Sequence, residues 1–144
     1  MSQSGSGDQS LGFGIMTTPP GFATVTPYVF AEDAPAFCDF LIEGLGAEEV
    51  SRDLDGDRIA NAQFRLGNCM MMVSEAGRGF PPMPASYYLY VDDADAAQRR
   101  AIAAGATEVS PVRDQSYGDR QGGVRDTHGN YWWISQRLTE GGYD

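Results

Sequence analysis

Two nine-residue stretches of the chain repeat one another: Tyr28-Val-Phe-Ala-Glu-Asp-Ala-Pro-Ala at 28–36 and Tyr88-Leu-Tyr-Val-Asp-Asp-Ala-Asp-Ala at 88–96. Two further matches follow in the same order, Gly46-Ala-Glu-Glu-Val-Ser with Gly105-Ala-Thr-Glu-Val-Ser and Gly67-Asn68 with Gly129-Asn130. The three matches lie 59 to 62 residues apart. We therefore interpret the chain as two copies of one supersecondary unit of about 50–60 residues, which are too few for a solenoid and would lie side by side.

The pattern of each copy predicts a strand, a helix and three more strands. Asp33 is the expected helix N-cap in the first copy, with Gly44 or Gly46 at the helix end, and Asp93 and Gly105 are their equivalents in the second. The expected strands are, in order, 24–30, 47–52, 58–66, 69–74, 86–91, 107–112, 120–125 and 131–136.

One folded domain is expected over residues 23–138. It would consist of module one (24–74), a proline-rich linker (75–85) and module two (86–137). The low-complexity residues 1–22 predict a flexible N-terminal tail, and residues 139–144 predict a loose C-terminus.

The composition excludes several functions. The 144 residues include ten arginines, no lysine, twenty acidic residues and one histidine, His128, for a net charge of −10. Schiff-base and phosphate-loop lysines are therefore excluded, as is a metal site with two histidines, and the acidic balance argues against a nucleic-acid partner. The sequence has no apolar run of the roughly 20 residues that a membrane span requires. Cys38 and Cys69 form no CxxC motif, so we expect a reduced, cytoplasmic protein with no membrane partner.

Strand alternation predicts which side chains face away from the helices. With one helix per copy, only one face of each sheet can be covered. We expect the covered face to hold Ala62, Phe64, Met70, Met72 and Trp132. The uncovered face is expected to hold aromatic and sulfur-containing side chains, namely Tyr28, Phe30, Cys69, Met71, Tyr88, Tyr90, Tyr131 and Trp133. Such a surface suits a pocket for a flat organic molecule, or alternatively a dimer interface or a closed core.

Motifs over residues 24–137 resemble the vicinal oxygen chelate superfamily, which includes glyoxalase I, bleomycin-resistance proteins and extradiol dioxygenases. The resemblance rests on Val91-Asp-Asp-Ala-Asp-Ala, Gly105-Ala-Thr-Glu-Val and Arg125-Asp-Thr-His-Gly-Asn-Tyr-Trp. Thr26-Pro-Tyr-Val-Phe and Asp114-Gln-Ser-Tyr-Gly-Asp-Arg are similar to its PhnB-like branch. The resemblance implies an α+β fold and a homodimer. Two tandem βαβββ modules would form one curved eight-stranded mixed sheet with a concave cavity and with helices on the convex side.

The resemblance also indicates where a metal would bind. Members of the superfamily normally place His, Glu or Gln at four ligand positions, and motif alignment puts these at Thr26, Met71, Ser86 and Trp133. None of the four side chains suits a divalent cation, so we expect no metal and no cofactor. The PhnB-like branch often shows His-Ala-Glu where this chain has Asn61-Ala62-Gln63, so ionisable groups are replaced by amides.

The polar loop at 114–120 has two interpretations. At a cavity mouth, Gln115, Tyr117 and Arg120 would orient a ligand, with Arg120 donating to a carboxylate or carbonyl. Alternatively, Arg120 pairs with Asp114 or Asp119 and only holds the strand in place. We interpret His128, in a tight turn, as a surface residue and not as a catalytic base.

The leading functional hypothesis is a metal-independent glyoxalase/bleomycin-resistance-like protein that binds a small aromatic ligand, as drug-sequestering members of the superfamily do. Its expected ligand contacts are Tyr28, Asn61, Gln63, Met71, Tyr88, Tyr90, Gln115, Tyr117, Arg120 and Trp133. The alternative is a lyase or isomerase acting on a small carbonyl compound through Asp114, Tyr117 or Arg120, although no catalytic residue can be assigned. A third hypothesis is an interaction module whose sheet face a partner covers.

Overall fold

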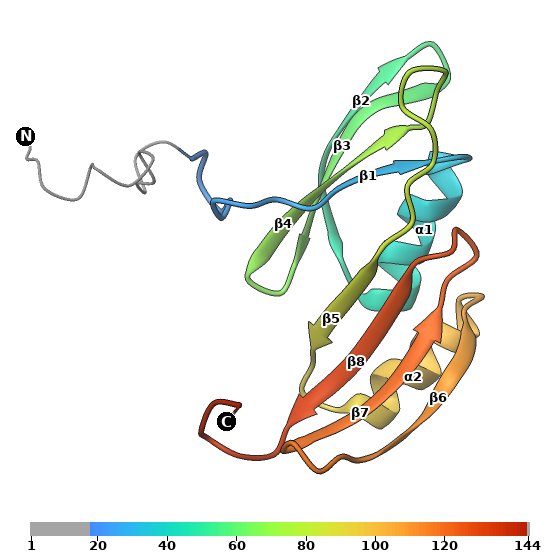
Figure 1. The fold of residues 1–144 in the computed structure, drawn as a ribbon. Coiled ribbons are helices and arrows are strands. Elements are labelled where there is room, and N and C mark those ends of the chain that lie inside the picture. The colour runs from blue at the N-terminus through green and yellow to red at the C-terminus, as the bar shows by residue number, and fades with distance from the viewer. Residues whose placement is uncertain (1–17, 144) are drawn as a thin grey trace, which may run out of the picture.

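A computed structural model describes residues 18–143 (Figure 1). The predicted flexible tail lies outside the described residues up to position 17. Residues 18–22 form a turn in which the amide of Phe22 donates to the carbonyl of Pro19 at 3.1 Å. None of the described helices is long and apolar enough to cross a membrane.

The described chain folds as two βαβββ modules, which confirms the predicted α+β class. Module one consists of β1 (Tyr28–Ala31), α1 (Ala34–Leu45), β2 (Glu48–Asp55), β3 (Arg58–Leu66) and β4 (Cys69–Glu75). Module two consists of β5 (Ser86–Tyr90), α2 (Ala94–Ala103), β6 (Thr107–Asp114), β7 (Asp119–Arg125) and β8 (Tyr131–Arg137).

Hydrogen bonding groups the eight strands into two four-stranded mixed sheets, one in each module. The strand order is β1-β4-β3-β2 in module one and β5-β8-β7-β6 in module two. In both sheets the first strand is parallel to its neighbour and the other pairs are antiparallel. The two modules therefore repeat one topology, as the duplicated sequence predicts.

The helices begin at the predicted residues but in different ways. Asp93 caps α2 in the expected manner, since its carboxylate accepts from the amide of Ala96 at 3.1 Å. Asp33 instead adopts a left-handed conformation with φ of 57° and makes no side-chain cap. Gly46 ends α1 with φ of 77°, and its amide donates to the carbonyl of Ile42.

The core lies on the helix side of both sheets. It is built from fully buried apolar side chains of both modules, including Phe37, Leu41, Phe64, Val73 and Ile134. Each such side chain contributes about 1.5–3 kcal/mol through burial. Because the core occupies only the helix side, the opposite face of each sheet is not part of this apolar core.

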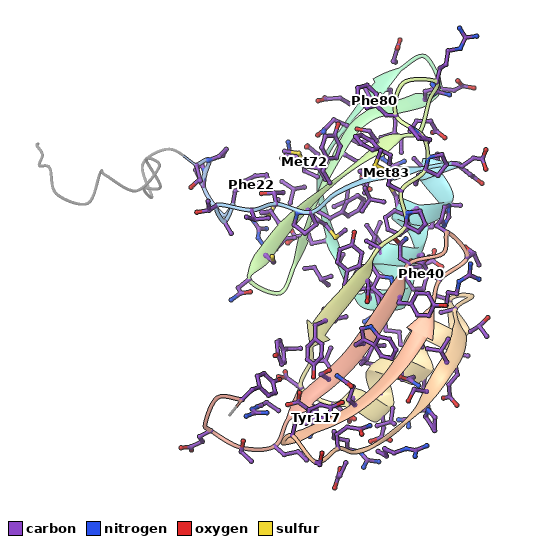
Figure 2. The ribbon with its side chains drawn as sticks, viewed as in Figure 1. Phe22, Phe40, Met72, Phe80, Met83 and Tyr117 are labelled. Atoms are coloured by element: carbon purple, nitrogen blue, oxygen red, sulfur yellow. The ribbon has the colours of Figure 1, made fainter. Side chains whose placement is uncertain are left out.

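The two modules meet through their helices. α1 and α2 pack against each other, and Phe40 lies between the modules (Figure 2). The Arg100 guanidinium on α2 donates to the carbonyls of Glu43 at 2.8 Å and Ile42 at 3.2 Å, which satisfies backbone acceptors at the end of α1. Among the described residues no strand of one sheet pairs with a strand of the other.

Candidate functional site

The faces of both sheets opposite the helices form what we call the open face. Cross-strand partners place Tyr28, Met72 and Gln63 there in module one. Tyr88, Trp133 and Gly123 occupy the corresponding places in module two. Large apolar side chains on or beside this face are 45% exposed at Tyr88, 55% at Tyr90 and 61% at Phe80. Several aromatic side chains of this face are therefore exposed, and β4 contributes different residues from those expected.

Met71 does not lie on the open face, where the sequence predicts it. Met71 pairs with Phe64, is 4% exposed and belongs to the core. Its neighbour Met72 lies opposite Tyr28 and Gln63 and is only half-buried. Figure 2 shows Met72 on module one, on the same side as Phe80. Val73, which alternates with Met72 on β4, is fully buried in the core.

The error comes from two turns of unequal length. Gly67 and Asn68 form a two-residue hairpin between Leu66 and Cys69. In module two, β7 and β8 are instead joined by five residues, 126–130, between Arg125 and Tyr131. The buried Asp126 carboxylate organises this longer loop by accepting from the Asn130 amide at 3.0 Å and the Trp132 indole at 2.8 Å. The two Gly-Asn pairs are therefore not at equivalent positions relative to the strands that follow them. A prediction that equates them places β4 one residue out of register, and this puts each of its side chains on the opposite face of the sheet.

Trp133 lies flat across the open face of module two because its neighbours are small. A Cβ atom at Gly123 would lie 2.6 Å from the indole ring, so the ring rests directly on the β7 backbone. The indole N–H donates to the hydroxyl of Ser86 at 2.8 Å. Tyr131 stacks beside it, with ring centroids 6.1 Å apart.

Asp119, at the start of β7, is the charged centre of this face. It is fully buried, and its Oδ2 accepts from the hydroxyl of Tyr88 at 2.6 Å. Its Oδ1 accepts from the Arg137 guanidinium at 2.9 Å. Tyr143 donates a second phenol hydrogen bond to Oδ2, also at 2.6 Å. The carboxylate is thus held in place by three donors from the open face.

These contacts change how the groups titrate. Burial acts to raise the pKa of Asp119, but the hydrogen bonds from Tyr143, Tyr88 and Arg137 outweigh it and hold the pKa below its ordinary value. Burial and the hydrogen bond to Asp119 raise the pKa of Tyr88. The same two causes raise the pKa of Tyr143. At neutral pH the centre is therefore a carboxylate surrounded by neutral phenols and one guanidinium.

Arg120 lies away from the open face and is ion-paired, as the alternative interpretation predicts for Asp114 but not for Asp119. Arg120 pairs with Asp95 of α2 at 2.7 Å and with Asp114 of β6 at 2.9 Å. It alternates along β7 with Asp119 and Gln121, so it lies on the helix face of the sheet. These ion pairs raise the pKa of the guanidinium and tie α2 to the sheet.

The other polar loop residues support the open face. Tyr117 donates to the side-chain oxygen of the buried Gln121 at 2.5 Å, and the Gln115 amide donates to the Gln121 carbonyl at 3.2 Å. Gln121 in turn donates to the hydroxyl of Ser135 at 2.7 Å. Gln115 therefore braces the loop, whereas the ring of Tyr117 remains 44% exposed.

On module one, the amides predicted to contact a ligand lie on the open face. The Asn61 amide donates to the sulfur of Met72 at 3.8 Å, and the Gln63 amide approaches the Asn61 oxygen at 3.5 Å. Tyr28 forms a hydrogen bond with Ser74 at 2.8 Å. Since Ser74 donates its own proton to the carbonyl of Ala60, Tyr28 is the donor. Asn61 and Gln63 are half-buried, so both remain accessible from this face.

The open face carries two shallow hollows. The hollow on module two encloses about 370 Å³ and is lined by Tyr88, Tyr90, Tyr117 and Tyr143. The hollow on module one encloses about 380 Å³, and its lining includes Tyr28, Phe30, Phe80 and Arg58. Both are open and aromatic, which fits the side of a flat molecule.

A third hollow, of about 520 Å³, lies where the two modules meet, away from the tyrosines. Its lining includes Asp33, Met83 and His128. The His128 ring packs against Phe37 with centroids 5.3 Å apart, and its Nε2 lies 3.3 Å from the carbonyl of Asp33. His128 thus contacts module one and is half-buried, where a surface residue was expected.

The residues at the expected metal positions do not fit a metal. With the corrected register, Met72 replaces Met71 as the module-one equivalent of Trp133. The set is then Thr26, Met72, Ser86 and Trp133, which offers neither a carboxylate nor an imidazole. Ser86 and Trp133 are hydrogen-bonded to each other. Within residues 18–143, no three His, Cys, Asp or Glu side chains are grouped so that they could hold a metal ion.

The site predicted from the sequence does not include Asp119, Arg137 or Tyr143. Asp119 appeared only as a candidate partner of Arg120. Alternation along β8 already places Arg137 on the face of Trp133 and Ser135, so this residue could have been found. Tyr143 lies in the segment that was expected to be loose, and no sequence pattern indicates its contact with Asp119.

Comparison with known proteins identifies the family. Residues 21–134 match the model of the Glyoxalase/Bleomycin resistance protein/Dioxygenase superfamily. A protein of Mycobacterium bovis, described as uncharacterized protein Mb0911c, is 30% identical over 128 residues, covering 81% of this chain and 84% of that protein. This chain therefore belongs to the glyoxalase/bleomycin resistance protein/dioxygenase superfamily, as the sequence motifs indicate.

Solved structures show the same fold. TioX from Micromonospora sp. ML1 aligns with a TM-score of 0.67 at 24% identity, over 83% of this chain and 100% of TioX. TnmS3, an antibiotic binding protein from Streptomyces sp. CB03234, aligns with a TM-score of 0.64 at 19% identity, over 80% of this chain and 98% of TnmS3. At these sequence identities, the similarity to the two solved structures shows a shared fold.

Proposed function

We propose that this protein binds a small aromatic organic molecule on its open face, without a metal or other cofactor. The observation that carries the proposal is the aromatic side chains of the open face, of which Tyr28, Tyr88 and Tyr90 are exposed and Trp133 is half-buried. Exposed aromatic rings of this kind stack on flat ligands, and the polar groups orient them. The antibiotic-binding description of TnmS3, which shares the fold, supports a ligand of this class.

We propose further that a second copy of the chain completes the site as a homodimer. The hollows on both modules are open, and apolar side chains such as Phe80 and Met83 are about half exposed or more. Burial of such a surface drives association, since large exposed apolar patches usually mark a contact. Sedimentation velocity would then give twice the chain mass at micromolar concentration, whereas a monomer at all concentrations would contradict the homodimer.

The geometry favours binding over the alternative of a lyase or isomerase. That reaction would use Asp114, Tyr117 or Arg120 for proton transfer or to stabilise an oxyanion. Arg120 is paired with Asp114 and with Asp95 of α2, while Tyr117 donates to Gln121 near the open face. Each of the three side chains therefore already has a partner within the chain.

The loop at 114–120 supports assignment to the PhnB-like branch of the superfamily, which we also propose. The two thiols, Cys38 and Cys69, are free, and this supports a reducing, cytoplasmic setting.

Two adjacent tryptophans give a matched test of ligand binding. Trp133 lies on the open face and Trp132 is buried on the helix face at 3% exposure. A panel of flat aromatic compounds, cationic and neutral, is titrated into the Trp132→Phe and Trp133→Phe variants while tryptophan emission is recorded. Binding on the open face quenches the emission of Trp132→Phe, which retains Trp133, and leaves that of Trp133→Phe nearly unchanged. Equal quenching in both variants, or none across the panel, would overturn the proposal.

A further inference from the structure

Residues 139–143, which we call the C-terminal strap, lie against module two. Figure 1 shows the chain turning back on itself after β8, beside the end of β5. The Arg137 guanidinium holds the strap by donating to the carbonyls of Gly141 at 2.7 Å and Gly142 at 3.0 Å. The same guanidinium lies 4.3 Å from the ring centroid of Tyr143. The strap is thus attached to module two through one arginine and one tyrosine.

The hydroxyl of Tyr143 meets the most deeply buried charge on the open face. It donates to Oδ2 of Asp119 at 2.6 Å and contacts the hydroxyl of Tyr90 at 2.7 Å. A phenol has one proton, which Tyr143 gives to Asp119, so Tyr90 is the donor in the second contact. Tyr143 therefore uses all three parts of a phenol: its proton, its oxygen lone pairs and its ring face.

The rest of the strap is loosely packed. All its residues are exposed, and Tyr143 itself is 51% exposed. A Cβ atom built at Gly141 or Gly142 would meet nothing within 4 Å. The strap backbone has no close packing at these positions, so only the Tyr143 side chain and two carbonyls hold it.

We propose that Asp119 and Arg137 form a binding site for an aryl hydroxyl group, and that Tyr143 occupies this site until a phenolic ligand displaces it. This inference rests on the proposed binding function and names its ligand class. The ligand hydroxyl replaces that of Tyr143 as a donor to Asp119, and its ring takes the place over the Arg137 guanidinium. The oxygen of the ligand accepts from Tyr90, so every contact of Tyr143 is reproduced.

The surroundings of the carboxylate make the site selective for hydroxyl donors. Asp119 is fully buried, and Tyr88 continues to donate to Oδ2 when Tyr143 leaves. An aryl ether carries no proton, so it would leave a buried carboxylate oxygen facing an ether oxygen, which is unfavourable. A phenol therefore binds better than its methyl ether, although the two have the same rings.

The strap competes with ligand because it is tethered to the site that it fills. A tethered group has a high effective concentration, so a free phenol must displace it. Removal of Tyr143 leaves the site permanently open. The apparent affinity for the ligand then rises by the ratio of the closed to the open population of the strap, which is about tenfold when the closed state is favoured by about 1.4 kcal/mol.

The test compares 2-naphthol with 2-methoxynaphthalene by calorimetric titration of the full chain. Tyr143→Ala is expected to bind 2-naphthol about tenfold more tightly than the wild type. Tyr143→Phe, which keeps the ring but not the donor, should give a smaller gain. In Tyr143→Ala, 2-naphthol should bind about tenfold more tightly than 2-methoxynaphthalene. Tyr87→Phe, which removes a hydroxyl from a β5 residue on the helix face, serves as the matched control and should bind like the wild type.

Asp119→Asn in the Tyr143→Ala background should remove the preference for the naphthol, with thermal melting recorded to establish that the variant is folded. Equal affinity of Tyr143→Ala and wild type for 2-naphthol, or equal binding of the naphthol and its ether, would overturn the inference. In that case the proposed function still stands if aromatic compounds quench Trp133. If no compound binds to any variant, both proposals fail.

Discussion

The indole N–H of Trp133 donates to the hydroxyl of Ser86 across the parallel strands β8 and β5, with 2.8 Å between nitrogen and oxygen. The resemblance to the superfamily predicts metal-ligand positions at these two residues. Their mutual hydrogen bond instead joins a hydroxyl and an indole, neither of which suits a divalent cation. The bond holds the Trp133 ring over the β7 backbone on the open face of module two.

This bond gives the first prediction. Ser86→Ala removes the hydroxyl that accepts from the Trp133 indole. Because Trp133 is only half-buried, a water molecule can take the place of that hydroxyl, and the free energy of unfolding should fall by less than about 1 kcal/mol. The emission of Trp133 should shift to longer wavelength, measured in the Trp132→Phe background. Ser86→Thr keeps the hydroxyl and should leave the emission in place. An unchanged spectrum in Ser86→Ala would argue against the hydrogen bond.

The register of β4 gives a second prediction. Met71→Ala empties part of the core and should lower the free energy of unfolding by about 2–5 kcal/mol. Met72→Ala removes a half-buried side chain from the open face and should cost less than about 1 kcal/mol. Urea denaturation of the two variants measures the difference. If Met72→Ala were the more destabilising of the two variants, the register predicted from the sequence, with Met71 on the open face, would be correct.

Asp119 gives a prediction about acid. Its pKa is lowered in the folded state, so the stability it contributes is present above the ordinary carboxyl pKa of 3.8 and is lost as the pH falls through the lower folded value. Asp119→Asn should therefore be less stable than the wild type at pH 6, and the gap should narrow below about pH 4. Urea midpoints between pH 6 and pH 2.5 measure this. Asp55→Asn, at the exposed end of β2, is the control and should be about as stable as the wild type at pH 6.

The two cysteines should differ in reactivity. Cys38 is buried in α1, and burial raises its pKa to about 11, so at pH 8 it is protonated and shielded. Cys69 is exposed at the start of β4. Ellman's reagent should therefore react with one thiol per folded chain, and Cys69→Ser should abolish that reaction. Release of two thiols from the folded wild type would contradict the burial of Cys38.

The fold could be predicted because it depends on local patterns that occur twice. The paired stretches at 28–36 and 88–96 place a strand and a helix in each copy, and strand alternation assigned Phe64 and Trp132 to the core and Tyr88 to the open face. These features depend on periodicity and capping within a few residues, so one sequence is sufficient to read them.

The site was only partly predictable because its contacts depend on register and on residues far apart in the chain. Met71 was misplaced by a difference in turn length that the matching Gly-Asn pairs conceal. Arg120 could pair within its loop or face a ligand, and the partner that decides the matter, Asp95, lies 25 residues away on α2. Tyr143 reaches Asp119 by a reversal of the chain that no pattern indicates.

Arg100 and the helix contact hold the two modules together on the side away from the open face. The apolar core and the contact between the helices, which stabilise the chain, therefore both lie on the helix side of the sheets. Most substitutions among the exposed rings of the open face should change stability by only about 0.5 kcal/mol. A protein arranged in this way can acquire a new ligand preference without a compensating change in its core, so its scaffold is inherently evolvable.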